Sequence, residues 1–591
     1  MNNNSPFNLF QIDPRMDINQ SKLSDGANRK NKEESNFEHT TSFILTLRKK
    51  KYKKELYIKR KLEFMASNNN YYETPEKIEY TYDDFFNGKI YNDLKNSYIK
   101  NDEKKTADII YSMTQALIDI QIDHIFSKKL FPDDDSSLNT NDELNNKDNF
   151  PFLITEICFN TKKRTIFQYG FDLILNFSYI SNTFCRKIIN EKNINKIFNR
   201  LIYFYPLFAI INNSDSDIEE ESQKKDESYY FGSLTIKLLG NLFVSSNSYE
   251  AFEVNNFYGK LFLLLSVFDL DYKNKQNIAI RYEYLDTLLW LVNLIIEFVE
   301  GIVLKYSDII LNIIPNLLDI IRAFYYTEET EILNRVIFFI ENISYIRDDL
   351  IIKIVESNGI ANLINLFGYL FTTDKNSGET VLTSDIINKI ISIFINIFTL
   401  DSKYLQNIDY SQFALVIERL LSLYRLHHSN HFDIQSSLIN LLSNLACFND
   451  IEGIVNKILL NNNIIKYLFN YYNKYHLSEI LWFLDNMADK QLKKVRDYIL
   501  NMGGFEIIKN TICNYNEDNK NLIEKSIGTL YKIIEAEKAF NIRLLFEKLY
   551  QNSIPEKIKD FYLNVNYSPE LEMKIKSIIK DFEAYEKSLD N

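Results

Sequence analysis

Seven asparagines recur inside otherwise apolar stretches of this chain, at intervals of 42 to 65 residues. Each is followed by an apolar residue, as in Leu-Gly-Asn-Leu-Phe and Leu-Val-Asn-Leu-Ile. They are Asn176, Asn241, Asn293, Asn342, Asn396, Asn444 and Asn486. Recurrence over tens of residues is typical of a solenoid, in which each repeat packs only on its neighbours. Equivalent helices of a solenoid line one surface, so we expect the seven amides to form a row.

The residues that make tight turns are scarce. The sequence has 14 glycines and 9 prolines among 591 residues, about a third of their usual combined share of roughly 12 %. This leaves too few turn residues for a β-sandwich or barrel, and too few glycines for the phosphate loops of a doubly wound sheet. A hydrophobic share of 46 % excludes a mainly disordered chain. The sequence therefore predicts an all-α protein.

Three polar breaks lead into similar helical phrases. They are residues 357–367, 461–469 and 502–512, which read SNGIANLINLF, NNNIIKYLF and MGGFEIIKNTI. A sharp corner between two helices favours glycine or asparagine, because one residue there adopts a left-handed backbone conformation. We therefore expect a corner between consecutive helices at each break.

The net charge of −12 is divided unevenly along the chain. Residues 1–65 hold 14 Lys and Arg against 8 Asp and Glu, and the rest hold 54 against 72, so the arm carries +6 and the body −18. Residues 1–42 are polar and expected to be disordered. Residues 43–65 are predicted to form one amphipathic basic helix, which repels itself and should order only on an acidic partner.

Composition also excludes several partners. An acidic body repels nucleic acid, whose binding depends on neutralising phosphates, so no nucleic-acid partner is expected. The most apolar stretch, residues 288–304, is interrupted by Asn293, Glu297 and Glu300. Because the first thirty residues are polar and contain no signal peptide, we expect no membrane partner and an intracellular protein.

No motif for catalysis or metal binding stands out. The chain contains no Gly-x-Ser-x-Gly, no phosphate-binding loop and no His-Glu-x-x-His. Its four cysteines form no Cys-x-x-Cys pair, which favours a reducing compartment. His427, His428 and His431 lie in a polar run that is typical of a loop between helices. We expect no enzyme, no catalytic residue, no metal site and no cofactor.

An amide offers both a hydrogen-bond donor and an acceptor, so a row of them can hold the main chain of an extended peptide without reading its side chains. The alternative is chance, because the chain contains 69 asparagines. Chance does not readily place one asparagine per repeat at the same local position. The spacing therefore favours a peptide-binding row.

Three separated regions resemble the importin-α nuclear-import adaptors, a family built of armadillo repeats. Residues 47–61, LRKKKYKKELYIKRK, look like the core of the family's importin-β-binding helix. The amide row is similar to the family's Trp-x-x-x-Asn pairs on the third helix of most repeats. Residues 546–561 and 570–579 are similar to its atypical last repeat.

The resemblance implies an all-α, right-handed superhelical solenoid of armadillo repeats with a flexible basic N-terminal helix. It implies an importin-β-binding arm over residues 1–80, repeats over 81–545 and an atypical repeat over 546–591. The expected function is a nuclear-import adaptor that binds basic localisation signals in an asparagine-lined concave groove and shuttles between cytoplasm and nucleus. Expected partners are importin-β, basic cargo proteins and, at the C-terminal repeats, an export receptor with Ran.

In the family the asparagines bond the cargo main chain, while tryptophans pack on lysine stems. The cargo-binding residues implied here are Asn176, Asn241, Asn293, Phe338, Asn342, Asn396, Asn444, Trp482 and Asn486. The residues implied to bind importin-β, and to occupy the groove until importin-β removes them, are Leu47, Arg48, Lys49, Lys51, Leu56, Lys59, Arg60 and Lys61.

The chain departs from the family at the aromatic walls. Tryptophan stands four residues before the asparagine only at Trp482. The other six positions hold Asp172, Lys237, Leu289, Phe338, Ser392 and Asn440. Trp290 lies three residues before Asn293 and is expected to point away from the groove. The three walls of the early repeats are missing, and Lys237 is expected to repel a cargo lysine. Cargo binding is therefore expected at the later repeats around Asn444, Trp482 and Asn486, or through a non-standard signal.

Three alternatives remain open. The chain could be an armadillo scaffold that no longer reads basic import signals, or a regulator that only sequesters importin-β through its arm. The triplet Lys59-Arg60-Lys61 could be an ordinary solvated face or the protein's own localisation signal. The family's arginine cluster ahead of Leu47 is absent, which predicts weaker importin-β binding.

Overall fold

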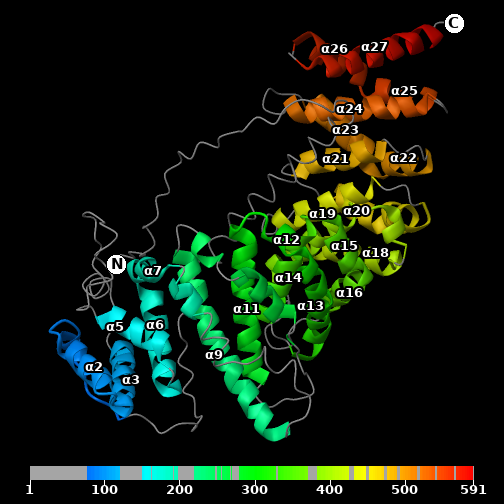
Figure 1. Ribbon diagram of the computed structural model, residues 1–591. Helices are drawn as coiled ribbons and strands as arrows, with labels where there is room; N and C mark the ends of the chain where they lie inside the picture. The colour runs from blue at the N-terminus through cyan, green and yellow to red at the C-terminus, as the bar shows by residue number, and fades with distance from the viewer. Residues whose placement is uncertain are drawn as a thin grey trace, which may run out of the picture. The chain divides into compact units, whose positions relative to one another are not determined.

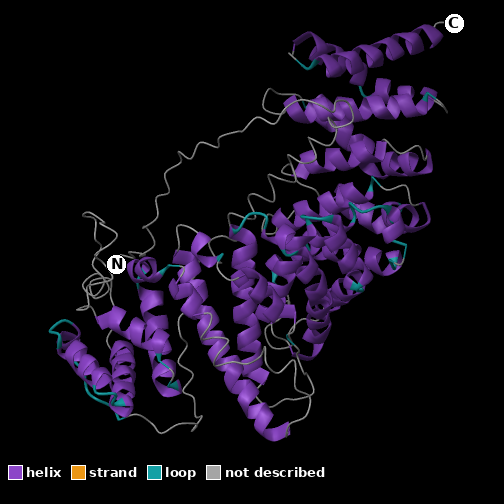
Figure 2. Cartoon of the chain, in the orientation of Figure 1, coloured by secondary structure: helices purple, strands orange, loops and turns teal. Residues whose placement is uncertain are grey.

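The structure, a computed structural model, describes residues 76–119, 150–161, 163–190, 192–197, 218–245, 249–253, 256–266, 268, 278–327, 330–370, 383–406, 408–424, 432–447, 451–470, 476–488, 493–514, 520–538, 542–564 and 567–589. These residues form helices joined by short turns, with no strand among them (Figure 2). The predicted all-α class is confirmed. The basic helix predicted over residues 43–65 lies outside the described residues, as do its eight importin-β-binding positions, which therefore stay predictions.

Helices far apart in the sequence pack side by side in chain order, each on the next, to form one continuous row (Figure 1). We call them the row helices. They are α3 (Glu103–Asp119), α6 (Arg164–Ile180), α9 (Ile218–Ser245), α11 (Ile278–Phe298), α14 (Thr330–Ser344), α17 (Ser384–Ile397), α19 (Phe432–Leu445), α21 (Leu477–Ala488), α24 (Lys520–Glu537) and α27 (Pro569–Leu589).

A second set of helices stacks alongside the row. In it, α10 packs on α13, α13 on α16, α16 on α18 and α18 on α20, while α23 packs on α26. Their bounds are α10 (Phe257–Ser266), α13 (Ser307–Thr327), α16 (Gly359–Leu370), α18 (Tyr410–Leu423), α20 (Asn462–Asn470), α23 (Phe505–Cys513) and α26 (Ile554–Asn564). In both stacks each helix packs on the helices next to it along the stack. Packing between neighbouring repeats is the organisation of a helical solenoid.

Shorter helices lie before or between the longer ones along the chain. They are α2 (Lys89–Ile99), α5 (Phe150–Asn160), α7 (Asn182–Ile188), α12 (Ile302–Lys305), α15 (Asp348–Glu356), α22 (Lys493–Ile499) and α25 (Ile542–Gln551). Within the described ranges no single helix is long and apolar enough to cross a membrane. Only the bent pair α15 and α16, taken together, has the required length and composition.

A boundary between consecutive helices lies at each of the three predicted breaks, and two of them contain a left-handed residue. Asn358 has φ 60° and Gly503 has φ 122°, both in the left-handed region. The chain bends by 68° between α15 and α16, across Asn358. At the break that opens residues 461–469, Asn461 acts differently, because its Oδ1 accepts hydrogen bonds from the backbone N–H groups of Asn463 at 2.9 Å and Ile464 at 3.3 Å. There the asparagine caps the start of α20.

A glycine lets two row helices, α9 and α11, pack closely against each other. Gly240 on α9 faces the buried Trp290 on α11, and a Cβ atom added to Gly240 would lie 2.2 Å from Trp290 Cζ3. Trp290 is only 2 % exposed. It is therefore a packing residue of the core, as its spacing from Asn293 predicts.

We expect Gly240→Ala to destabilise the chain by about 1–3 kcal/mol, because α9 and α11 must separate to admit the methyl group. Urea unfolding followed by circular dichroism measures this. Gly528→Ala is the matched control, since nothing lies within 4 Å of the added Cβ on α24. Its expected effect is neutral or stabilising by up to about 1 kcal/mol. Equal effects of the two variants would contradict the packing argument.

Candidate peptide-binding row

The seven recurring asparagines lie on consecutive row helices, one on each. Asn176 is on α6, and the others follow in order on α9, α11, α14, α17, α19 and α21. We call these seven side chains the amide row. Because each of these helices packs on the next, the sequence period corresponds to a spatial repeat.

Most of these amides donate a hydrogen bond to a neighbouring row helix. Asn241 Nδ2 donates to Ser178 Oγ at 3.0 Å, and Asn396 Nδ2 donates to Ser344 Oγ at 2.8 Å. Each of these serines lies two residues after the preceding asparagine of the row. The bonds therefore connect equivalent places on adjacent repeats.

The remaining cross-helix bonds go to backbone carbonyls. Asn444 Nδ2 lies 3.5 Å from the carbonyl oxygen of Ile395, and Asn486 Nδ2 donates to that of Ser443 at 3.0 Å. Asn293 Nδ2 donates to the carbonyl of Arg335 on the following helix at 3.0 Å. Because these acceptors lie within helices, the amides link the helices without unwinding them.

Burial differs along the row. Asn241 and Asn293 are fully buried, Asn342 is 4 % exposed, and Asn176 and Asn486 are half-buried. Among the described residues, Asn176 Nδ2, Asn342 Nδ2 and Asn293 Oδ1 have no hydrogen-bond partner. Each amide carries two donor hydrogens and two lone pairs, so a single cross-helix bond leaves capacity unused. Binding of a peptide main chain to this row remains a prediction.

The positions four residues before each asparagine differ in exposure. Leu289, Ser392, Lys237 and Phe338 are buried. Trp482 is half-buried on α21, four residues before Asn486. Among the seven positions, Trp482 therefore combines an aromatic ring with partial access to solvent.

The structure corrects the expected role of Lys237. This side chain is 5 % exposed and forms an ion pair with Glu283 on α11. It also lies close enough to Asp172 on α6 to oppose the rise in the pKa of that carboxyl group. The Glu283 carboxylate compensates Lys237, so this lysine does not present an unpaired charge to a cargo lysine. The expected repulsion was wrong because the sequence does not show which helices become neighbours.

Asp172 has an unusual environment for a carboxyl group. Burial raises its pKa to about 7, and the positive charge of Lys237 partly offsets that rise. Its Oδ1 atom has no hydrogen-bond partner among the described residues. A buried carboxylate with an unfilled acceptor favours protonation.

Two further basic residues contact neighbouring row helices. Arg335 on α14 forms an ion pair with Asp286 on α11. Lys389 on α17 is 3 % exposed, and its Nζ donates to Asn334 on α14 and to Asp385 at 2.6 Å. Burial lowers the pKa of the Lys389 amino group well below its usual range, whereas the Asp385 carboxylate beside it favours the ammonium form.

The ring at one predicted wall position is already in contact with this lysine. Lys389 Nζ lies 5.5 Å from the centroid of the Phe338 ring, within the range of a cation–π contact. Phe338 is therefore placed as a wall, but the cation over its face belongs to the chain itself.

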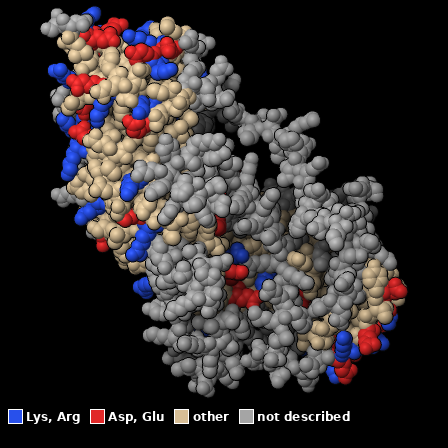
Figure 3. Space-filling model, turned by 180° about the vertical axis from the view of Figure 1, so that it is seen from behind, with Lys and Arg blue, Asp and Glu red and all other residues tan. Residues whose placement is uncertain are grey.

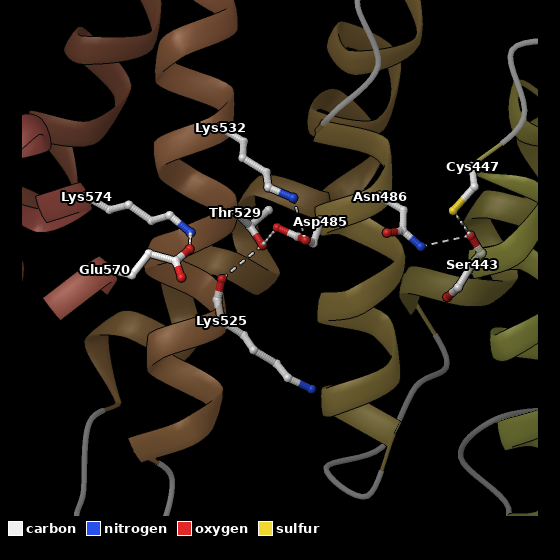
Figure 4. A network of polar contacts seen from close by, with 9 residues as sticks. All are labelled: Ser443, Cys447, Asp485, Asn486, Lys525, Thr529, Lys532, Glu570 and Lys574. Carbon is white, nitrogen blue, oxygen red and sulfur yellow. Dashed lines mark hydrogen bonds and ion pairs between the residues drawn. The ribbon is translucent and has the colours of Figure 1, made fainter. Parts of the chain in front are cut away.

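Polar contacts between adjacent row helices continue toward the C-terminal end of the row (Figure 4). Asp485 on α21 accepts hydrogen bonds from Thr529 Oγ1 at 3.2 Å and Lys532 Nζ at 2.7 Å, both on α24. Lys525 Nζ donates to Ser478 at 2.8 Å, and its charge opposes the rise that burial causes in the pKa of Glu479. Acidic and basic side chains are also interspersed on this part of the surface in the view of Figure 3.

The contact between α19 and the start of α21 contains a histidine in place of an ion pair. His476 is fully buried, with Nε2 2.8 Å from Gln435 Oε1 and Nδ1 3.5 Å from Ser436 Oγ. Burial lowers its pKa to about 4, so this imidazole is neutral at physiological pH. Asn440, four residues before Asn444 on α19, is half-buried, and its Oδ1 has no partner among the described residues.

Sequence reasoning missed the charged residues two turns before the asparagines. Four row helices carry a charge seven residues before the asparagine, namely Asp286, Arg335, Lys389 and Glu479. Two helical turns place these residues on the same face as the amide. The seven-residue spacing between charge and asparagine could therefore be found in the sequence, but the ion pairs between helices could not.

Comparison with known proteins gives likeness at the level of the fold. No protein-family model matches the chain, and no curated protein matches it. A crystal structure of an engineered protein from a structural genomics consortium is 12 % identical with TM-score 0.50, covering 84 % of this chain and 98 % of that one. Computationally designed armadillo repeat proteins for modular peptide recognition match at 12 % identity and TM-score 0.33, over 46 % of this chain and 99 % of theirs.

A designed armadillo repeat protein in complex with the peptide (KR)4 matches at 12 % identity and TM-score 0.33, over 47 % of this chain and 99 % of that one. The chain is an all-α solenoid of stacked helices, and its likeness to the engineered protein with TM-score 0.50 is one of fold. Within the described part of this solenoid, no group of three or more His, Cys, Asp and Glu residues is placed to hold a metal ion.

We expect the stability of this solenoid to fall as the pH rises from about 4 to about 7, in part because of Asp172. Its folded pKa of about 7 exceeds the ordinary aspartate pKa of 3.8, so the folded state binds the proton more tightly across that window. Asp172→Asn removes the effect. The melting temperature of Asp172→Asn relative to the unmodified chain should therefore be higher at pH 8 than at pH 5, by about 2 °C.

Asp560→Asn on α26 is the matched control, because Asp560 is exposed. Its effect on the melting temperature should be the same at both pH values. A pH-independent effect of Asp172→Asn would contradict the assignment of a raised pKa to that residue.

Proposed function

We propose that this armadillo-repeat-like solenoid is a nuclear-import adaptor, which binds extended basic peptides along the amide row and binds importin-β through its basic N-terminal arm. The observation that carries the proposal is the amide row itself, with one asparagine on each of seven consecutive row helices. Amides at regular intervals suit a ligand whose hydrogen-bonding groups also recur at regular intervals. The main chain of an extended peptide is such a ligand.

The charge of the N-terminal arm, residues 1–65, also supports the proposal. Nine of the fifteen residues in 47–61 are Lys or Arg, and residues 1–65 carry a net +6 against −18 for the rest. A strongly basic helix attached to an acidic body can bind either that body or an acidic partner. This supports an arm that alternates between the solenoid and importin-β.

The late part of the row is the better candidate for cargo. Trp482 and Asn486 lie one turn apart on α21, and both are half-buried. An aromatic face packs on a lysine stem while an amide one turn away bonds the main chain. Between α19 and the start of α21, the neutral side chains of Gln435 and His476 lie in contact. Cargo lysines are therefore proposed to bind between α19 and α21.

One observation favours the scaffold alternative. The acidic groups Glu283, Asp286 and Asp485 already pair with Lys or Arg on a neighbouring row helix. A carboxylate that stabilises the stack is less available to a ligand. A scaffold would use the same surface without basic selectivity.

A pull-down with and without residues 1–65 distinguishes the two functions. For an adaptor, the full chain should retain importin-β and the shortened chain should lose it, because the basic helix is gone. The shortened chain should also bind basic peptides more tightly, since its internal competitor is absent. A scaffold should show neither change.

Replacement of Lys59, Arg60 and Lys61 by alanine in the full chain is the matched control for the truncation. It should release the row for basic peptides without shortening the chain. Importin-β retained equally by the full and the shortened chain would exclude the arm as its binding element.

We expect Trp482→Ala to weaken binding of a basic peptide to the full chain by about tenfold, which corresponds to about 1.4 kcal/mol of lost packing and cation–π attraction. Fluorescence anisotropy with a labelled peptide measures this. Tyr98→Ala on α2 is the control, because it removes a 39 % exposed aromatic ring away from the row. Unchanged affinity after Trp482→Ala would rule out the late site.

A further inference from the structure

Lys389 occupies a site with the components that recognise an alkylammonium group. Its Nζ lies over the Phe338 ring and donates hydrogen bonds to Asn334 and Asp385. We call the ring and these two acceptors the Phe338 subsite. An aromatic face with a carboxylate and an amide oxygen is the set of groups that binds a lysine side chain.

The Phe338 subsite lies between adjacent row helices. Phe338 and Asn334 are on α14, whereas Lys389 and Asp385 are on α17. Phe338 also stands four residues before Asn342, the position of an aromatic wall. The chain's own lysine thus enters from the next repeat and fills the place that a ligand's lysine would take.

The subsite has little room for a second amino group. Lys389 is 3 % exposed and Phe338 is 5 % exposed, so the ring is covered where the two meet. A ligand lysine would have to displace Lys389 from Asn334 and Asp385 and then compete with it for the same face. Occupation of the site, rather than long-range repulsion, excludes the ligand.

Similar contacts flank this subsite on the N-terminal side. Arg335 pairs with Asp286 between α14 and α11, and Lys237 pairs with Glu283 between α9 and α11. Basic side chains of the chain itself therefore pair with acids across two successive steps, from α9 to α11 and from α11 to α14, and Lys389 bonds the amide of Asn334 at the next step. This stretch resembles a peptide site whose cation positions are already filled.

We propose that Lys389 is a specificity-determining residue that fills the Phe338 subsite and prevents the α14–α17 stretch from accepting a basic side chain. The inference rests on the proposed function, because it concerns which part of the amide row a basic peptide can use. It predicts that basic peptides bind elsewhere on the row and that removal of the Lys389 amino group opens this stretch to them.

The test compares the affinity of the full chain and its variants for a fluorescein-labelled octapeptide of alternating lysine and arginine. Lys389→Met shortens the side chain and removes the amino group, which vacates the position between the Phe338 ring, Asn334 and Asp385. It leaves Asp385, which is 42 % exposed and can be solvated. We expect Lys389→Met to bind the octapeptide at least about tenfold more tightly than the unmodified chain, because one ligand cation gains the ring and the carboxylate.

Two variants serve as controls. Lys389→Arg keeps a cation at the site and should change the affinity less than about twofold. Lys403→Met removes a lysine that also pairs with an acid, Asp401, and lies 4.7 Å from the centroid of the Tyr404 ring, but is 62 % exposed and lies outside the row helices. Its effect should also be less than about twofold. Equal affinity of Lys389→Met and the unmodified chain, with equal helical content by circular dichroism, would overturn the inference.

A second measurement uses the unmodified chain and does not depend on the folding of a variant. Photo-crosslinking of the octapeptide followed by mass spectrometry should give no crosslinks to α14 or α17. Crosslinks there would overturn the inference and leave the proposed function standing. A gain in Lys389→Met with no binding to the unmodified chain would support the inference but contradict basic cargo binding by the native protein.

Discussion

The stacking of this solenoid depends on polar groups that are buried between apolar helices and must find partners on the neighbouring repeat. A buried amide without a hydrogen bond costs about 1–3 kcal/mol, whereas a bonded one contributes modestly to stability. Asn396 and Asn486 each bond the preceding row helix, and Asn293 bonds the following one. Apolar side chains could pack at several registers, but an amide reaches its acceptor in few of them, so these bonds favour one register between successive repeats.

The same requirement governs the charged residues. Lys237, Arg335 and Lys532 each contact an acid on an adjacent row helix, and removal of either partner would leave a partly buried charge. Groups that would otherwise attract basic ligands are thereby used to hold repeats together. The acidity of the body therefore overstates its attraction for basic peptides, because a large net charge and a set of available carboxylates are different properties.

Local features of the fold could be predicted from the sequence, whereas contacts between repeats could not. The left-handed conformations of Asn358 and Gly503 follow from their own backbone preferences, and the period of the asparagines places them on successive helices. The partner of Lys237 lies 46 residues away on another helix, so its identity depends on how two repeats are aligned. Local periodicity indicates which face a residue occupies, but only the packed structure shows which residue lies opposite. For that reason the sequence predicts the amide row but not the ion pairs that compensate the charged residues beside it.

Stack stability and ligand recognition compete for the same side chains, and the middle of the row shows how they can be separated. Asn342 Nδ2 has no hydrogen-bond partner among the described residues, while Phe338, one turn earlier on α14, is covered by Lys389. An unused donor thus lies next to an amino group that already covers the aromatic ring. Under the proposed function, main-chain bonds along the row would be independent of side-chain identity and would hold a peptide in register without selecting for lysine. Selectivity for basic residues would then depend on positions such as Trp482, where an aromatic side chain is half-buried rather than covered.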